Sequence, residues 1–432
     1  MKDFATSDDP AVQAQLGRLA ALSLPQGRLG LETVHEMLAR MGNPELRLPP
    51  VFHVAGTNGK GSTCAYLRAM LEAQGLKVHV AIKPHLVRYN ERIRIAGELI
   101  SDRLLGELLK EVLDACEELG PSFFEVTTVA TFLAFARHPA DACVIEVGLG
   151  GRFDATNVMT KPAACGIATL GIDHEAFLLV PEDSAPEVPL ARIAFEKAGI
   201  ARAESPLVTM SYPPEAMEQI QLAAERAGAP LFMRGRDWSA AYAEEIQYRD
   251  AKGELTLPLP FLPGRHQAEN AALAVAILRH QDEVPVSVEA MAEGIRTARW
   301  PARLQLLSDG PLTHLAPGHE MWLDGGHNPD AGLAIGRHFA NSEGIHLIIG
   351  MLANRYPAAI LDPLEDRLAS VTAVPIEGSD CHQAEAYGEG ARWAGSVAEA
   401  LRSLPDDGRP VLIAGSLYLA GNVLQENGEV PN

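Results

Sequence analysis

The stretch from residue 54 to 63 combines the residue types that bind nucleotide phosphates. It reads Val-Ala-Gly-Thr-Asn-Gly-Lys-Gly-Ser-Thr and lies between a short apolar run and a pattern typical of an amphipathic helix. A glycine-rich turn between a strand and a helix presents backbone N–H groups to an anion. Lys60 adds a cation, and Ser62 or Thr63 can reach a metal ion. Because the first glycine of the standard P-loop would fall on Val54, we expect phosphate binding through a variant loop, with a simple tight turn as the alternative.

Three further residues have side chains that suit metal or phosphate chemistry. Glu146 ends an apolar run, where a carboxylate can bind a divalent cation or pair with the nearby Arg152. The glycines that follow it do not fit dinucleotide spacing, so no NAD site is expected. His174 follows another apolar run, and that position favours a function over the usual structural role of a lone histidine. Lys197, on spacing alone, is a lysine on a helix face.

Other polar residues could contact an anionic substrate. His327 and Asn328 follow an apolar run and would either face a nucleotide or shape a turn. Two cationic clusters are either solvated surface or a clamp for an acidic substrate or a transferring phosphoryl group: Lys83 with Arg88, Arg92 and Arg94, and Arg299 with Arg303.

Apolar runs alternate with helical patterns along the chain. This alternation predicts βαβ units and an α/β fold with mostly parallel sheets covered on both faces. Such sheets bind ligands at the carboxyl ends of their strands, where the phosphate loop, Glu146 and His174 all fall. The pattern restarts near residue 300. We therefore predict a P-loop-type domain over residues 1–300, followed by a smaller Rossmann-like α/β domain over 301–432.

Composition narrows the classes of partner. A chain of 432 residues is long enough for two or three domains. The formal net charge of −20 argues against nucleic acid, so an anionic substrate must meet a local cluster of cations. Five scattered cysteines without a CxxC pair favour reduced thiols over disulfides or a cysteine zinc site. With no long apolar run and no signal-peptide pattern, we expect a cytoplasmic monomer that does not enter membranes.

Six segments, in order, resemble the folylpolyglutamate synthase/dihydrofolate synthase branch of the Mur ligase family. They are residues 54–62, 84–92, 146–157, 196–199, 323–329 and 415–421. The resemblance implies an ATP-dependent ligase that joins L-glutamate to dihydropteroate and to folates through an acyl phosphate, releasing ADP and phosphate. The larger domain would bind ATP and the pterin, and the smaller one would be the glutamate-ligase α/β domain. A folylpolyglutamate synthase alone, another Mur-type amino-acid ligase, or a nucleotide-binding protein that has lost catalysis are the alternatives.

The resemblance also implies roles for single residues. Catalysis would depend on Lys60, Glu146, His174 and Lys197. ATP would be bound by Asn58, Gly59, Lys60, Gly61, Ser62, Asn270, Arg303, Asp324 and His327. The pterin would be bound by Arg28, Leu29, Gly30, Leu31, Ser122, Phe123, Phe124, Glu125 and Asp154. One or two Mg²⁺ ions would be held by Ser62, Glu146, His174 and Lys197, the last as N6-carboxylysine. The substrates would be ATP, L-glutamate and dihydropteroate or tetrahydrofolate.

Two features depart from the family pattern. Family members commonly have Ser-Pro where this chain has Lys83 and Pro84, and that serine is a magnesium ligand. An ammonium group cannot ligate Mg²⁺, so Lys83 either replaces the charge of one metal ion or turns away from the site. The loop from Leu178 to Pro189 is also longer than expected, so the role of Lys197 rests on its motif alone.

Overall fold

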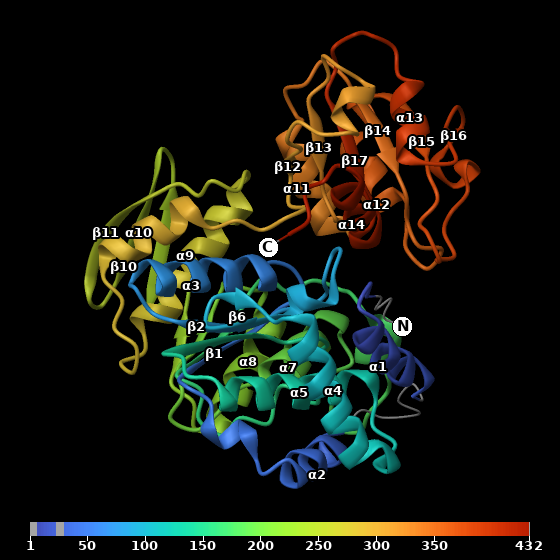
Figure 1. The fold of residues 1–432 in the computed structure, drawn as a ribbon. Helices are drawn as coiled ribbons and strands as arrows, with labels where there is room; N and C mark the ends of the chain where they lie inside the picture. Colours follow the sequence, from blue (N-terminus) through green and yellow to red (C-terminus); the bar gives the residue numbers. More distant parts are fainter. Residues whose placement is uncertain (1–6, 23–29, 432) are drawn as a thin grey trace. The chain divides into compact units, whose positions relative to one another are not determined.

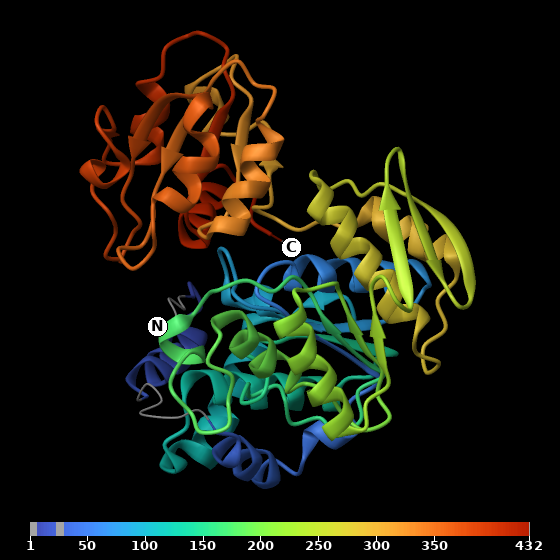
Figure 2. The same cartoon turned by 180° about the vertical axis from the view of Figure 1, so that it is seen from behind.

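The computed structural model describes residues 7–22 and 30–431, and Figures 1 and 2 show it from opposite sides. Internal contacts divide the chain into two compact units. The first comprises residues 1–261 and 267–298, and the second comprises residues 262–266 and 299–432. Each unit is built on a mostly parallel sheet with helices, which confirms the predicted α/β class.

The first unit contains an eight-stranded sheet in the order β4-β3-β2-β5-β1-β6-β7-β8. Its strands are β1 (Val51–Ala55), β2 (Val78–Ala81), β3 (Ile93–Ile95), β4 (Glu98–Leu99), β5 (Ala142–Glu146), β6 (Ala164–Ile167), β7 (Leu207–Thr209) and β8 (Leu231–Met233). Only the β2-β3 and β3-β4 pairs are antiparallel within this sheet. β1 pairs with β5 and β6 in parallel, so the carboxyl ends of these three strands share one edge.

Helices cover both faces of this sheet (Figure 1). The α-helices of the unit are α1 (Pro10–Ala21), α2 (Glu32–Arg40), α3 (Lys60–Ala73), α4 (Asp102–Cys116), α5 (Phe123–Arg137), α6 (Glu175–Leu178), α7 (Pro189–Ala198), α8 (Pro214–Ala227), α9 (Arg265–Arg279) and α10 (Val288–Thr297). Of these, α1 and α2 pack outside α4 and α5. α3, α9 and α10 lie on one face, where Gly166 of β6 lies against Ile277 of α9. α4 and α5 pack on the other face over Cys143 and Ile145, and α7 and α8 pack beside them over Ile167.

The first unit also contains a small antiparallel sheet that the sequence pattern did not predict. It consists of β9 (Trp238–Tyr242), β10 (Glu245–Asp250) and β11 (Gly253–Pro258). Buried and exposed residues alternate along β10, as expected of a strand with one solvated face. Among the described residues no helix is long and apolar enough to cross a membrane.

The second unit has a six-stranded sheet in the order β12-β13-β17-β14-β15-β16. Its strands are β12 (Gln305–Leu306), β13 (Met321–Leu323), β14 (Ile345–Ile349), β15 (Leu368–Ala373), β16 (Arg392–Trp393) and β17 (Val411–Ala414). Its α-helices are α11 (Pro329–His338), α12 (Ala358–Leu361), α13 (Val397–Arg402) and α14 (Leu417–Glu426). All strand pairs but β12-β13 are parallel. The apolar side chains of β14, which is buried along its whole length, form the centre of this unit's core.

Candidate active site

The phosphate loop joins β1 to α3 and comprises residues 56–59. Gly59 has φ +81° and is the N-cap of α3, a backbone conformation that residues with a side chain rarely adopt. A Cβ atom on Gly59 would also lie 2.3 Å from Oδ1 of Asn270. Glycine at this position therefore lets the loop turn while Asn270 of α9 lies against it.

Lys60 is the first residue of α3 and folds back over the loop. Its Nζ donates hydrogen bonds to the carbonyl oxygens of Gly56 at 2.9 Å and Thr57 at 3.1 Å. Two residues further along the helix, the side chain of Ser62 is buried. The helix N-terminus and this ammonium group place positive charge at the loop, which suits a bound anion.

The loop is fastened to the segment that follows β6. The backbone N–H of Thr57 donates to the carbonyl oxygen of Thr169 at 2.8 Å, and its hydroxyl donates to the carbonyl of Gly171 at 2.8 Å. His174 follows shortly after, with Nε2 3.8 Å from a carboxylate oxygen of Asp173 and a left-handed backbone. The structure thus brings the predicted loop and the predicted histidine to the same edge of the sheet.

Glu146 is the last residue of β5 and is buried at the same edge. It lies opposite Val54 in the β1-β5 register, and its Oε2 accepts a hydrogen bond from the backbone N–H of Lys83 at 3.1 Å. Burial raises the pKa of the nearby Cys64 thiol, the charge of Glu146 raises it further, and that of Lys60 opposes the rise. The charges of Glu146 and Lys60 therefore both act on the buried Cys64 of α3, close to the phosphate loop.

The loop that follows β5 packs on the end of α7. Gly151 has no room for a Cβ atom, which would lie 2.8 Å from the carbonyl oxygens of Glu196 and Lys197. Asp154 organises the loop from inside, because its carboxylate accepts hydrogen bonds from the backbone N–H groups of Gly148, Leu149 and Thr156 at 2.8–3.0 Å. The backbone N–H of Arg152 in this loop also donates to the carbonyl oxygen of Glu196 at 2.8 Å, so the loop and the end of α7 are in direct contact.

Lys197 lies in the last turn of α7 and is buried, not exposed on a helix face as its spacing alone suggested. Burial and, to a smaller degree, the positive charge of Lys60 lower the pKa of its amine to about 7. The carboxylates of Asp173, Asp154 and Glu196 act in the opposite direction. Near neutral pH much of this amine is uncharged, so it can act as a nucleophile.

An ion-pair network that the sequence pattern did not predict joins α7 to the loop that follows β5. Arg152 donates to Glu182 at 2.5 Å and 3.1 Å and to Glu196 at 2.8 Å and 3.2 Å. Arg192 lies 2.9 Å from Glu182 and 3.1 Å from Glu196. The sequence offers one signal for this network, the position of Glu196 next to Lys197. It suggests Glu146 as the partner of Arg152, whereas the structure pairs Arg152 with Glu182 and Glu196.

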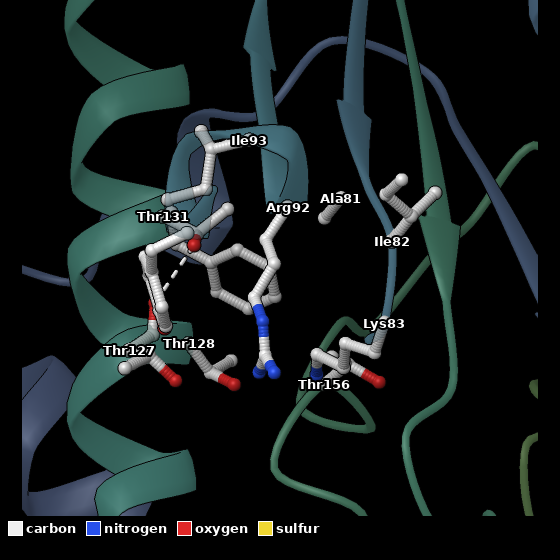
Figure 3. A pocket seen from close by; sticks show the side chains of 11 residues that line it. Ala81, Ile82, Lys83, Arg92, Ile93, Thr127, Thr128, Thr131 and Thr156 are labelled. Carbon is white, nitrogen blue, oxygen red and sulfur yellow. Dashed lines mark hydrogen bonds between the residues drawn. The ribbon is translucent and has the colours of Figure 1, made fainter. Parts of the chain in front are cut away.

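A pocket opens between β2 and α5 in the first unit (Figure 3). Its polar lining comprises Lys83, Tyr89, Arg92, Thr127, Thr128, Thr131 and Thr156. Nζ of Lys83 lies 3.4 Å above the ring centroid of Phe124, and Nε of Arg92 donates to Nδ1 of His85 at 2.9 Å. The hydroxyl of Thr128 is buried without a hydrogen-bond partner in the described part of the chain. Two cations and this hydroxyl suit an anionic or carbonyl-bearing ligand.

The segment Ser122–Glu125 begins α5 beside this pocket. Glu125 forms a capping box with Ser122, since its Oε2 accepts from the backbone N–H at 2.8 Å and the hydroxyl at 2.7 Å. Phe124 lies against Gly148, where a Cβ atom would be 2.3 Å from its ring. Arg28 and Leu29 lie outside the described residues. Of their neighbours, Leu31 packs on the core and Gly30 lies beside the carboxylate of Glu32.

The other predicted nucleotide contacts lie together in the second unit. Asp324 follows β13 and accepts hydrogen bonds from the backbone N–H groups of Leu304 at 2.8 Å and Gly326 at 2.6 Å. Burial raises the pKa of Asp324, and the charge of the nearby Arg303 opposes this rise. Nδ1 of His327 lies 3.1 Å from the carbonyl oxygen of Gly325. The structure therefore groups Arg303, Asp324 and His327 at the carboxyl end of β13.

The fold and the carboxyl edge of the first unit's sheet define a class of protein. It is an α/β enzyme with a variant phosphate loop, a buried acid and a buried lysine. No protein-family model matches the sequence. The chain is 32% identical over 415 residues to the folylpolyglutamate synthase of Lacticaseibacillus casei, covering 90% of this chain and 92% of that protein. It is 34% identical over 409 residues to the dihydrofolate synthase/folylpolyglutamate synthase of Escherichia coli K12, covering 92% and 91%.

Solved structures of proteins from the same family are also similar to this chain. Escherichia coli FolC in complex with DHPP and ADP matches with a TM-score of 0.84 at 31% identity, covering 97% of each chain. A bifunctional folylpolyglutamate synthase/dihydrofolate synthase with Mn, AMPPNP and L-glutamate bound matches with a TM-score of 0.82 at 31% identity, covering 96% of this chain and 97% of that one. This chain belongs to the folylpolyglutamate synthase/dihydrofolate synthase family, as its six motifs predicted. The predicted enzyme class, an ADP-forming ligase, is likewise confirmed.

Proposed function

We propose that this chain ligates L-glutamate to dihydropteroate, forming dihydrofolate, and to folates, extending their glutamate tail. ATP phosphorylates the acid substrate, and the amine of glutamate attacks the acyl phosphate, so that ADP and phosphate leave. The observation that carries the proposal is the meeting of the phosphate loop, Glu146 and Lys197 at one sheet edge. Two matched family members support it, since one structure holds DHPP and ADP and another holds Mn, AMPPNP and L-glutamate.

The phosphate loop and the first turn of α3 would bind the nucleotide through the backbone N–H groups of residues 58–62. On nucleotide binding, Lys60 would exchange its two carbonyl partners for phosphate oxygens, a stronger interaction because both partners are charged. Asn270 would contact the nucleotide from its place against Gly59. In the second unit, Arg303, Asp324 and His327 would supply the remaining contacts. These roles make positioning and charge neutralisation the main sources of acceleration.

The residues at this edge fit a divalent cation. Glu146 is a buried carboxylate, the hydroxyl of Ser62 is buried at the helix start, and His174 offers an imidazole nitrogen. A cation bound there would neutralise the charge that develops on the transferring phosphoryl group. Lys83 holds Glu146 through its backbone N–H and presents its ammonium to Phe124, which suits a fixed charge and not a ligand. Mg²⁺ as the metal, a monomeric state and a cytoplasmic location belong to the same proposal.

Lys197 would react with carbon dioxide to form a carbamate. The neutral amine attacks the carbon atom of CO₂, a C–N bond forms as one C=O π bond breaks toward oxygen, and the nitrogen releases a proton to solvent, so that a neutral amine becomes an anionic carbamate. The lowered pKa of about 7 supports this reaction because it leaves the amine uncharged near neutral pH. The resulting N6-carboxylysine would be a metal ligand beside Glu146 and His174.

The acid substrate would bind at the segment Ser122–Glu125 and the adjoining pocket. Phe123 and Phe124 offer aromatic surface for a planar pterin. The carboxylates of Glu125 and Asp154 already accept hydrogen bonds from their own loops, so they would shape the site more than bind the ligand. Gly30 and Leu31, with Arg28 and Leu29 before them, are the remaining proposed contacts.

The test is ADP release by the purified chain with ATP, Mg²⁺ and L-glutamate, adding dihydropteroate or tetrahydrofolate separately. We expect turnover with both acid substrates. Turnover with tetrahydrofolate alone would reduce the function to folylpolyglutamate synthesis. No turnover with either, in protein that binds ATP, would contradict the folate assignment and favour another Mur-type ligase or a protein that has lost catalysis.

A further inference from the structure

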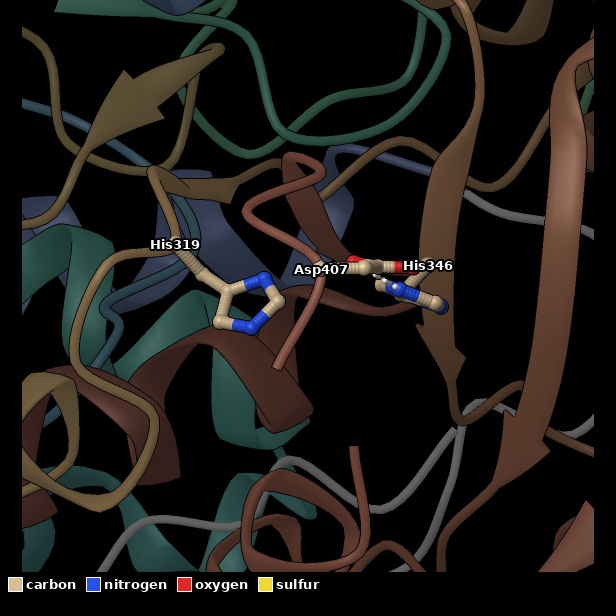
Figure 4. Close-up of side chains that lie close together, drawn as sticks. All are labelled: His319, His346 and Asp407. Carbon is tan, nitrogen blue, oxygen red and sulfur yellow. Dashed lines mark hydrogen bonds and ion pairs between the residues drawn. The ribbon is translucent and has the colours of Figure 1, made fainter. Parts of the chain in front are cut away.

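A cluster of two imidazoles and one carboxylate lies in the second unit and does not include Arg303, Asp324 or His327. His319, His346 and Asp407 each offer one ligand atom, and these atoms lie within 4.8 Å of one another (Figure 4). The three residues come from segments 27 and 61 positions apart in the sequence, counted from residue 319 to 346 and from 346 to 407. Their approach is therefore a product of the fold.

The sheet explains why they meet. His346 is the second residue of β14, His319 precedes β13, and Asp407 precedes β17, the strand between them. Met321 and His346 both pair with Val411 of β17. All three ligand candidates therefore lie at the amino end of adjacent parallel strands. Asp324 follows β13 at its carboxyl end, so the cluster occupies the opposite edge from the proposed nucleotide contacts of this unit.

The spacing and orientation of the side chains suit a metal ion. Nε2 of His346 lies 3.1 Å from Oδ1 of Asp407. Two ligands of a tetrahedral zinc ion, each about 2.05 Å from the metal, are themselves about 3.3 Å apart. His346 is buried, and its Nδ1 lies 2.7 Å from the hydroxyl of Ser370. Metal-binding histidines usually have their second ring nitrogen held in this way.

The other two residues are held in the same manner. Nδ1 of His319 lies 2.7 Å from the carbonyl oxygen of Arg409, which can only accept, so Nδ1 carries the proton and Nε2 is left to ligate. The guanidinium of Arg409 lies 3.4 Å from Oδ2 of Asp407, the oxygen that does not face His346. An ion pair of His346 with Asp407 would account for those two residues but gives no reason for the second imidazole.

We propose that His319, His346 and Asp407 form a binding site for a divalent transition metal such as Zn²⁺ or Co²⁺. Two imidazoles and a carboxylate are a donor set that such ions prefer over Mg²⁺, and three protein ligands leave one position for water. The ion ties together the amino ends of β13, β14 and β17. It is a structural site, separate from the ligase chemistry.

The test measures Co²⁺ bound to the full, untagged chain by equilibrium dialysis and by visible absorption, in excess Mg²⁺ to fill oxygen-rich sites. The variants are His319→Gln and Asp407→Asn, both at positions that are not fully buried. The matched control is His314→Gln, since Nε2 of His314 lies 2.7 Å from Oδ1 of Asp309 in an exposed pair of the same unit. Each variant's ADP release and circular dichroism verify that it is folded.

We expect one Co²⁺ per chain in the parent protein and in His314→Gln, with at least a tenfold loss of affinity in His319→Gln and in Asp407→Asn. Zn²⁺ should displace the bound Co²⁺, and ligase turnover should be the same in all four proteins. The proposal is overturned if the parent chain holds no Co²⁺ under these conditions. It is equally overturned if both cluster variants bind Co²⁺ as tightly as the parent, because the ion would then lie elsewhere.

Discussion

At the scale of single residues, the proposed site contains side chains whose surroundings change their chemistry. Lys197 is an ordinary lysine in the sequence, but burial lowers its pKa to about 7. A neutral amine costs less to bury than an ammonium group, which is why it can lie near Lys60. Because the spacing predicts an exposed lysine on a helix face, only the motif around Lys197 indicates its proposed role.

Lys197 should give the stability of the protein a pH dependence. Between about pH 7 and pH 10 an unfolded lysine is protonated while the buried amine is neutral, so the unfolded chain binds more protons and stability rises with pH by up to about 1.4 kcal/mol per unit. Lys197→Met should remove this rise. Urea unfolding at about pH 7 and about pH 9, in buffer free of carbon dioxide, measures it. The exposed Lys110→Met is the control, and an unchanged slope in Lys197→Met would show that the amine stays charged.

Gly59 should be needed for nucleotide binding beyond its backbone conformation. Gly59→Ala forces a left-handed alanine, at a cost of about 1–2 kcal/mol, and places a Cβ atom against Asn270. Gly75→Ala is a matched control, since Gly75 has φ +86° with nothing within 4 Å of its Cβ position. Both variants should lose similar stability in thermal unfolding. Only Gly59→Ala should lose ADP affinity, by roughly tenfold or more in calorimetry, and equal affinities would rule out a role of this turn in binding.

At the scale of elements, two loops and α7 are held together by charges that are far apart in sequence. Arg152 lies in the loop after β5. It pairs with Glu182, which lies between α6 and α7, and with Glu196 of α7. Sequence patterns predict a strand end such as Glu146, because an apolar run visibly stops there. They do not predict which acid an arginine will contact, since that depends on how separate elements pack. The small sheet β9-β10-β11 was missed for a related reason, because its short alternating runs lie among charged residues.

Breaking the Arg152 network should cost more than breaking an exposed pair. Arg152→Met leaves Glu196 buried without this partner, and we expect a loss of about 2 kcal/mol in unfolding free energy together with a lower kcat. Arg137→Met is the control, because Arg137 pairs with Glu111 at 2.6 Å and 2.7 Å on the surface. Its loss should stay under about 1 kcal/mol. Urea unfolding and ADP release measure both, and equal losses would mean that the network contributes no more than a surface ion pair.

At the scale of the whole molecule, the chain is acidic, and the proposed acidic substrates would meet local positive charge on it. The formal net charge is −20, yet the phosphate loop has Lys60 and a helix N-terminus, and the pocket has Lys83 and Arg92. The sequence was enough to predict the α/β class, both mostly parallel sheets and the edge where the loops meet. It was not enough to predict the burial of Lys197 or the cluster at His319 and His346, because both arise only when distant segments pack together.

The central claim, that ATP activates the acid substrate as an acyl phosphate, has a direct test. Dihydropteroate labelled with oxygen-18 in its carboxylate is incubated with the purified chain, ATP, Mg²⁺ and L-glutamate, and the released phosphate is analysed by mass spectrometry. We expect one labelled oxygen to pass from the carboxylate to each phosphate, and dihydrofolate to form in equal amount. Dihydrofolate formed alongside unlabelled phosphate would contradict it, since the carboxylate oxygen would then never have been bonded to phosphorus.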